Sequence, residues 1–485
     1  MSYKKILLVN LLSHEERFFG RRTVLRAGLG YIAQALEECG IDYAVEDLAL
    51  GYSLGHLIEH ARTYQPDAIG VTLFTYRYLD AYALLRSLKK HLPDIPVIAG
   101  GPHITASGIT VLQECEAIDI GISGEGEEVF PRICRGEAPS TVPGIMYRDG
   151  GEVRFSGERA RIKDLNALAF PRYSHFDLDR YPVDNMPAAE RDIPIITSRG
   201  CPYDCIYCPV QTAIGHEFRY RNVASVLEEL RYWYGRGYRR FSFIDDNFTL
   251  LKQRIVELCD EILSSSLKDL RMSLPNEVRA DKVDAPLLEL MYRAGFRHLG
   301  FGVEAGNDRI LKALKKHESM ATIEHAISAA VSIGYQVDLF FIIGSPGETE
   351  RDVEDSIAIA TRYKVASAFF FNLIPYPGTE LFDWIHKHGK FIYHPSHYLN
   401  RINSSQTIPV FSTPEFSADA RRQMLRKARA AVAKAQRDRY VARLTRRGLP
   451  RIIASPVARL YAIPVIQRLW NDTPILKTLK RAILP

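Results

Sequence analysis

Short, continuous apolar runs alternate with amphipathic segments along the first part of the chain. The apolar runs are residues 6–9, 67–73, 96–99 and 119–122, and apolar positions recur at helical spacing in residues 29–38 and 78–91. Strands without polar alternation are buried on both faces, as in a parallel sheet that is covered by its crossover helices. Because such crossovers are right-handed, the pattern predicts a doubly wound, Rossmann-like α/β domain. Its ligands are expected at the carboxyl ends of the strands.

A second alternating series follows a segment that is rich in Pro, Gly and charge, with a hairpin expected near residues 149–151. Its six strand candidates are residues 193–197, 240–244, 270–274, 298–303, 336–343 and 368–374. The amphipathic segments between them are residues 223–234, 252–263, 285–294, 310–314, 321–333 and 352–363. Six βα units predict a partial (β/α)6 barrel that works at the carboxyl ends of its strands. We expect domains at 1–138 and 191–385, a linker at 139–190 and a helical C-terminal region at 386–485.

Composition places the chain among globular proteins. Of its 485 residues, 46% are hydrophobic and 25% are charged, which excludes a mainly disordered or fibrous chain. An uninterrupted apolar run of about 18 residues, as a membrane span requires, is absent from the sequence. The apolar stretch near the N-terminus is short for a signal peptide, so we expect a cytoplasmic protein.

The net charge of +6 is unevenly distributed. From Glu415 onward there are 17 Lys and Arg against 4 Asp and Glu, so the rest of the chain is mildly acidic. Residues 418–447 fit a solvated helix. Beyond them, branched aliphatic residues interleave with Arg, which favours an anionic membrane surface over nucleic acid, while four prolines interrupt any long helix. We therefore hypothesise a peripheral contact with the inner face of the membrane and a lipid-like or other small-molecule substrate.

Three of the seven cysteines form one cluster with the spacing Cys-x3-Cys-x2-Cys: Cys201, Cys205 and Cys208. Three thiolates in one loop can bind three irons of a [4Fe–4S] cluster and leave the fourth iron open. The alternative is zinc, which needs a fourth ligand from elsewhere. The remaining cysteines are scattered singly, so a disulfide framework is not expected.

Together with the aromatic residue before the last cysteine, this loop resembles the signature of radical S-adenosylmethionine (SAM) enzymes. Polar and glycine-rich motifs follow the next five predicted strands, at the positions where that family binds SAM. The resemblance covers roughly residues 191–385 and implies SAM contacts at Tyr207, Asp245, Asp246, Asn276, Arg279, Glu304, Gly344 and Pro375.

The glycine-rich strand ends of the first domain resemble the cobalamin-binding domain found in a subgroup of these enzymes. The resemblance implies cobalamin contacts at Leu29, Gly30, Thr72, Gly100, Gly101, Pro102, Gly124, Glu125 and Gly126. Glycines suit this task because a broad corrin needs close backbone approach. The sequence lacks the Asp-x-His-x-x-Gly pattern that supplies a cobalt-ligating histidine. We therefore expect His14 and His103 to be polar loop residues.

The resemblance implies an enzyme whose [4Fe–4S] cluster, fed by a flavodoxin- or ferredoxin-type reductant, cleaves SAM to a 5′-deoxyadenosyl radical. In the enzymes of this family that use cobalamin, the most frequent reaction is methylation of an unactivated carbon. Cyclisation or rearrangement without methyl transfer is the alternative. A methylthiotransferase is less favoured, because Cys39, Cys115 and Cys134 lie far apart for a second cluster. Tyr393, His394, His397 and Tyr398 are substrate-contact candidates by position.

Overall fold

The computed structural model describes residues 2–11, 25–181, 190–401 and 408–461. Its first domain is a seven-stranded sheet in the order β2-β1-β3-β4-β5-β6-β7. The strands are β1 (Lys5–Asn10), β2 (Asp42–Asp47), β3 (Ala68–Thr72), β4 (Val97–Gly100), β5 (Ile120–Ile122), β6 (Ile145–Asp149) and β7 (Glu152–Phe155). The helices are α1 (Ala27–Glu38), α2 (Leu54–Tyr64), α3 (Tyr78–His91), α4 (Pro102–Ser107), α5 (Thr110–Glu114) and α6 (Val129–Cys134). Strands β1 to β5 are parallel, which confirms the doubly wound domain.

One part of this sheet was not expected, and one expected element is joined to it. The strand β2 and the helix α2 were not expected, because β2 is an edge strand in which Asp42, Glu46 and Asp47 interrupt the apolar run. The expected hairpin near Gly150 is present as β6 and β7, and it extends the sheet through antiparallel pairing with β5.

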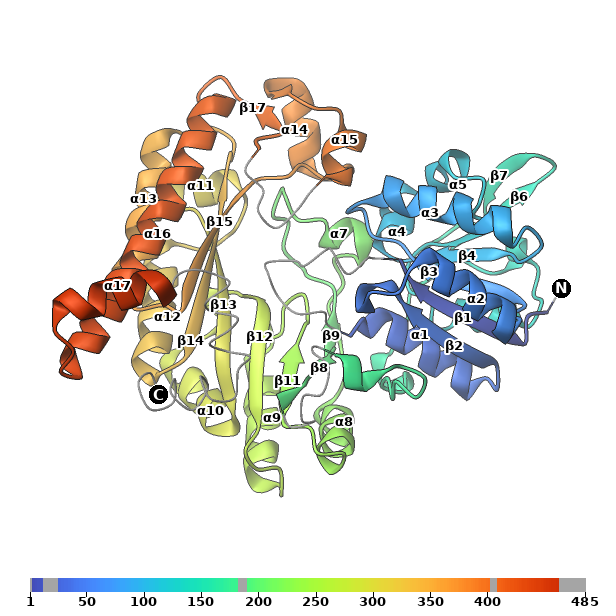
Figure 1. Cartoon of the computed structure of the whole chain (residues 1–485), viewed down its shortest axis with the longest axis horizontal. Helices are drawn as coiled ribbons and strands as arrows, with labels where there is room; N and C mark the ends of the chain where they lie inside the picture. Colours follow the sequence, from blue (N-terminus) through green and yellow to red (C-terminus); the bar gives the residue numbers. More distant parts are fainter. Residues whose placement is uncertain (1, 12–24, 182–189, 402–407, 462–485) are drawn as a thin grey trace.

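The second domain is a six-stranded, all-parallel sheet in the order β15-β14-β13-β12-β11-β8, which confirms the partial barrel. Its strands are β8 (Asp192–Ile195), β11 (Arg240–Phe243), β12 (Arg271–Val278), β13 (Phe296–Glu304), β14 (Gln336–Ile343) and β15 (Ser367–Asn372). Its helices are α8 (Val223–Gly235), α9 (Lys252–Ser264), α10 (Ala285–Ala294), α11 (Asp308–Ala313), α12 (Met320–Ile333) and α13 (Glu350–Arg362). The two sheets lie side by side, with α7 (Val210–Ala213) and the two-stranded ribbon of β9 (Ser198–Arg199) and β10 (Arg219–Tyr220) near their boundary (Figure 1).

Local signals in the sequence set the ends of the barrel helices. The Ser319 side chain accepts a hydrogen bond from the backbone N–H of Thr322 at the start of α12, and Gly334 ends that helix at a φ of 110°. Thr349 and Asp352 form a reciprocal capping box at the start of α13. These caps satisfy backbone groups that have no partner inside the helix.

Helical elements complete the chain beyond β15. They are α14 (Glu380–His388), α15 (Pro395–Asn400), α16 (Ala418–Arg446) and α17 (Arg451–Tyr461), with a small ribbon of β16 (Lys390–Phe391) and β17 (Phe411–Ser412). Short 3₁₀ turns lie at Leu48–Leu50, Pro139–Thr141, Leu165–Ala167, Leu178–Arg180 and Ala280–Lys282.

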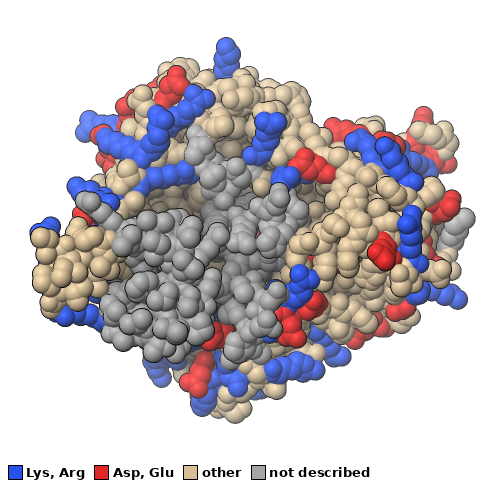
Figure 2. All heavy atoms as spheres, viewed as in Figure 1, with Lys and Arg blue, Asp and Glu red and all other residues tan. Residues whose placement is uncertain are grey.

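The long helix α16 is not simply a solvated helix. It packs along β15 and α13 and buries Met424, Leu425, Ala428 and also Arg421. Its exposed Lys and Arg, such as Arg426 and Lys427, lie on the outer side of the helix, and Lys and Arg side chains gather at the upper left of the surface (Figures 1 and 2). The chain then turns, and α17 packs back on the end of α16 with Pro456 inside it. Within the described residues, every helix is too short or too polar to cross a membrane.

Candidate active site

The three clustered cysteines lie on the loop between β9 and α7, after the first barrel strand. The end of α11 and the start of α14 hold this loop: Ile206 N–H donates to the Leu314 carbonyl (3.2 Å), and Leu381 N–H donates to the Ile206 carbonyl (2.9 Å). Burial raises the pKa of Cys205 to about 11 and that of Cys208 to about 12. Thiolates at such positions need a nearby positive centre, and cluster irons meet that need.

The donor set fits a cluster better than a single ion. In the described ranges, no three His, Cys, Asp or Glu side chains come close enough to surround one metal ion. A [4Fe–4S] cluster has a different requirement, because each thiolate binds a different iron.

Two carboxylates after β11 hold the base of the cysteine loop. Asp245 is buried and accepts hydrogen bonds from Thr197 N–H (2.7 Å), Thr197 Oγ1 (2.5 Å) and Ser198 Oγ (2.6 Å). Asp246 accepts one from Gly200 N–H (2.9 Å). Gly200 has a φ of 87°, and a Cβ there would lie 2.2 Å from a backbone oxygen, so only glycine fits. Asp245 and Asp246, predicted as SAM contacts, therefore position the loop.

A buried polar group lies at the carboxyl ends of β12 and β13. Glu304 Oε1 accepts hydrogen bonds from Tyr207 Oη (2.8 Å) and Lys316 Nζ (2.9 Å). Glu304 has a φ of 64°, a left-handed conformation that costs a non-glycine residue on the order of 1 kcal/mol and is often found at functional sites. Burial, and next the charge of Glu304, raise the pKa of Glu277 to about 8. Lys316 was not predicted, because it belongs to no recognisable motif. Glu277 lies between the predicted Asn276 and Arg279 but was not itself predicted.

The other predicted SAM contacts also lie at carboxyl strand ends, and several have protein partners. Asn276 Nδ2 donates to the Ile244 carbonyl (2.8 Å), and the Pro375 carbonyl accepts from Tyr398 Oη (2.6 Å). Gly344 has a φ of 113°, and a Cβ there would lie 2.6 Å from Arg421 Nη1. The two hydrogen bonds hold the end of β12 to the loop after β11 and the loop after β15 to α15. In the loop after β14, Ser345 N–H donates to Glu348 Oε2 (3.0 Å).

The Arg279 guanidinium also has protein partners. It donates to the Lys316 carbonyl (2.9 Å), the His317 carbonyl (3.2 Å) and Asp281 (2.9 Å), and it lies 3.5 Å from the ring centre of Tyr203 in the cysteine loop. Arg279 thus joins the cysteine loop to the turn that carries Lys316.

A cavity of about 440 Å³ lies at the carboxyl ends of β1, β3, β4 and β5. Eight of the nine predicted cobalamin contacts line it: Leu29, Thr72, Gly100, Gly101, Pro102, Gly124, Glu125 and Gly126. Gly30 does not, because its Cα faces the linker, where a Cβ would lie 2.4 Å from Tyr173. A Cβ on Gly28 or Gly100 would meet no protein atom within 4 Å, so both glycines leave room in the cavity.

The second domain closes this cavity. Its contribution comes from the segments after β8 and β11 and from the end of α7: Ile196, Ser198, Arg199, Ala213, Ile214, Ile244 and Asp246. The glycine-rich strand ends and the segments that carry the cysteine loop therefore face one shared space.

Known protein families match both domains. A model described as the radical SAM superfamily matches residues 195–360, and a model described as a B12 binding domain matches residues 23–134. The chain is a radical SAM enzyme with a B12-binding domain. A [4Fe–4S] cluster, SAM and cobalamin are therefore its cofactors, as predicted.

Proteins with similar sequences include methyltransferases and a cyclase. A Pyrococcus horikoshii protein named as an uncharacterized methyltransferase is 28% identical over 406 residues, which cover 83% of this chain and 86% of that protein. The anaerobic magnesium-protoporphyrin IX monomethyl ester cyclase of Cereibacter sphaeroides is 27% identical over 370 residues, covering 74% of this chain and 60% of the cyclase. The radical SAM methyltransferase TsrM of Kitasatospora setae, solved with tryptophan and a SAM analogue, has the same fold, with a TM-score of 0.68 and 18% identity over 81% of this chain and 82% of that one.

Of the two histidines that were expected to be polar loop residues, His103 is described by the structure, and it is a packing residue within α4 rather than a loop residue. His103 is buried, lies 2.9 Å from Tyr82 Oη and packs on the ring of Tyr78, and burial lowers its pKa to about 4. In the described part of the chain, no histidine lines the shared cavity. His14 lies outside the described residues.

The scattered cysteines of the B12-binding domain do not lie at the shared cavity. Cys39, Cys115 and Cys134 follow or end α1, α5 and α6, whereas the cavity is lined by the carboxyl ends of the strands. Cys115 and Cys134 are buried, and burial raises the pKa of both thiols. This arrangement is typical of thiols that pack in a core.

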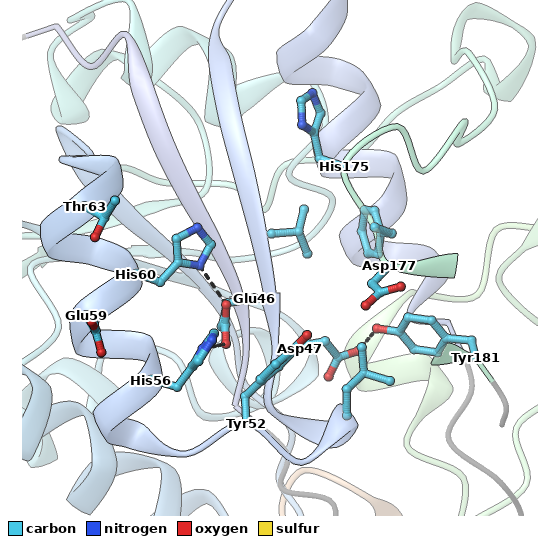
Figure 3. Close-up of a pocket in the computed structure, with 13 residues that line it drawn as sticks. Glu46, Asp47, Tyr52, His56, Glu59, His60, Thr63, His175, Asp177 and Tyr181 are labelled. Carbon is cyan, nitrogen blue, oxygen red and sulfur yellow. Dashed lines mark hydrogen bonds and ion pairs between the residues drawn. The ribbon is translucent and has the colours of Figure 1, made fainter. Parts of the chain in front are cut away.

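A second cavity, of about 550 Å³, lies between β2, α2 and the linker (Figure 3). Here the buried Glu46 lies 2.7 Å from the Nδ1 atoms of both His56 and His60, and Asp47 accepts a hydrogen bond from Tyr181. None of the predicted site residues lines this cavity.

The four substrate candidates lie around α15. His394 caps α15 by accepting from Ser396 N–H (3.3 Å), Tyr393 stacks on His397, and Tyr398 is buried. His394 and Tyr398 therefore have structural roles, while Tyr393 and His397 stay candidates.

Proposed function

We propose that this enzyme methylates an unactivated carbon of a small or lipid-like molecule in a cobalamin-dependent reaction. The supporting observation is the cavity that both domains line. It brings the glycine-rich strand ends of the B12-binding domain next to the segments that hold the cysteine loop. Methyl transfer to a substrate radical needs this proximity, since reacting groups must be held in contact distance.

The site contains residues suited to the cluster and to cobalamin. Cys201, Cys205 and Cys208 would hold the cluster, and the uncrowded Gly28 and Gly100 would leave room for cobalamin. When bound, these cofactors supply a hydrogen-abstracting carbon radical and a transferable methyl group.

The chain itself provides position and a dry surrounding. Glu304 is held between Tyr207 and Lys316, so its carboxylate is fixed in one orientation at a position where the resemblance implies a contact with SAM. Nearly complete burial of Glu304 and Lys316 excludes water from this side of the site. The loops after β12, β14 and β15 are fixed by their own hydrogen bonds, so the site is largely preformed.

The test is anaerobic reconstitution with hydroxocobalamin and isotope-labelled SAM against candidate metabolites. A methylated product that appears with both 5′-deoxyadenosine and S-adenosylhomocysteine supports the proposal. Iron and sulfide quantitation should give one cluster per chain; two clusters would instead support a methylthiotransferase.

A cyclisation without methyl transfer is the second candidate, favoured by the similarity to the monomethyl ester cyclase. Formation of 5′-deoxyadenosine without S-adenosylhomocysteine would support that function. Both candidates need a one-electron reductant of the flavodoxin or ferredoxin type.

A further inference from the structure

Arg199 joins the two domains beside the shared cavity. It lies two residues before Cys201, and its guanidinium donates to Glu125 Oε1 (2.8 Å) and Glu127 Oε1 (2.7 Å) of the loop after β5. All three side chains are nearly buried, with exposures of 11%, 9% and 6% for Arg199, Glu125 and Glu127. All three also line the cavity. One side chain thus links the cobalamin-side loop to the strand that leads into the iron–sulfur loop.

A second arginine makes this arrangement depend on Glu125. In the antiparallel ribbon of β9 and β10, Arg219 lies directly opposite Arg199, a pairing of like charges that is unfavourable by itself. Arg219 Nη1 donates to Glu125 Oε2 (2.6 Å), so the two oxygens of Glu125 bind the two arginines. Burial alone would raise the pKa of Glu125, but the hydrogen bonds from Arg219 and Arg199 hold it below its usual value.

Both loops are rigidly held on their own sides. On the cobalamin side, Gly124 N–H donates to Thr105 Oγ1 (2.9 Å), and Glu125 N–H donates to the Ala160 carbonyl (2.9 Å). On the other side, Gly200 N–H is bound by Asp246. Because neither loop is free to adjust separately, a shift of one is transmitted through Arg199 to the other.

We infer that Arg199 is a positioning residue that couples cobalamin binding to SAM binding by fixing the Gly124–Glu127 loop against the cysteine loop. This inference rests on the proposed function, because it requires both cofactors. Its physical basis is that two sites held on one rigid ion-pair group bias each other's geometry, and such coupling acts equally in both directions.

The experiment measures the SAM dissociation constant of the cluster-reconstituted chain with and without hydroxocobalamin, and the hydroxocobalamin dissociation constant with and without SAM. The variants are Arg199→Gln and Glu127→Gln. Arg362→Gln is the matched control, because Arg362 also forms two hydrogen bonds with one carboxylate, that of Glu324, on the exposed outside of the barrel. The EPR spectrum of the reduced cluster with SAM is recorded in parallel.

In the wild type and in Arg362→Gln, each cofactor should change the affinity for the other by roughly fivefold or more, by equal factors in the two directions. In Arg199→Gln that factor should fall close to one, and added cobalamin should no longer change the EPR spectrum. Glu127→Gln keeps the contacts of Glu125, so it should fold and retain a reduced factor; it carries the test if Arg199→Gln does not fold.

Two outcomes overturn the inference. In the first, the wild type binds both cofactors, but neither cofactor changes the affinity for the other. In the second, Arg199→Gln and Glu127→Gln retain the full wild-type change in affinity. A purely structural role would lower the melting temperature and leave the factor unchanged. A wild type that binds no cobalamin contradicts the proposed function instead, so the two failures are distinguishable.

Discussion

A larger side chain in the shared cavity should weaken cobalamin binding without destabilising the folded protein. Gly100 is the last residue of β4 and lines the cavity, and a Cβ there meets no protein atom within 4 Å. In Gly100→Val the Cβ therefore has room in the free protein, and the two methyl groups branch from this uncrowded position. The free protein should be as stable as the wild type or gain up to about 1.5 kcal/mol, because the new side chain is partly buried and an element-end glycine is removed.

The complex should be weakened by the same substitution. Overpacking a filled site costs about 1–3 kcal/mol, which corresponds to a roughly 5- to 150-fold higher dissociation constant for cobalamin. The assay is an absorbance titration of the cluster-free protein with hydroxocobalamin, together with thermal unfolding. Gly235→Val is the control, since Gly235 ends α8 and also has no neighbour near its Cβ position. Unchanged affinity in a folded Gly100→Val protein would refute the placement of cobalamin in this cavity.

Four further predictions concern single sites. The pKa of His103 is lowered by burial from 6.5 to about 4, so lowering the pH from 6.5 to 4 should cost about 3 kcal/mol of unfolding free energy as the unfolded chain takes up a proton. Urea unfolding at several pH values should show this loss in the wild type and not in His103→Gln, which should bind cobalamin normally. Cys205→Ser should lower reconstituted iron from about four per chain to near zero, read by iron analysis and EPR. Lys316→Met should destabilise the protein by about 3–5 kcal/mol in urea unfolding, because Glu304 loses its buried partner, and restoring the stability with Glu304→Gln would confirm that cause. The chain should float with anionic liposomes in low salt, and the double variant Ile452→Asp, Ile453→Asp, at two exposed positions, should abolish this; equal flotation of that variant would contradict the membrane hypothesis.

The positions of the main strands along the sequence could be predicted because these strands are buried on both faces, so continuous apolar runs mark them. The edge strand β2 was not predicted, because its polar residues, which face the linker and α2, interrupt its apolar run. The position of the site also followed from topology, since parallel strands present their carboxyl ends at one edge of a sheet. Lys316 could not be predicted: it follows the short helix α11 and acquires its role only when the fold brings it to Glu304.

Glu125 shows why motif residues need the structure to be interpreted. The resemblance implies that this residue contacts cobalamin, and it does line the cavity, yet its two carboxylate oxygens bind Arg199 and Arg219, 74 and 94 residues further along the chain. Glu125→Gln would leave two buried arginines facing each other across a ribbon, so it should disturb the cysteine loop as well as cobalamin binding. Loss of cobalamin in that variant would therefore report on the domain interface, whereas Gly100→Val reports on the cavity alone.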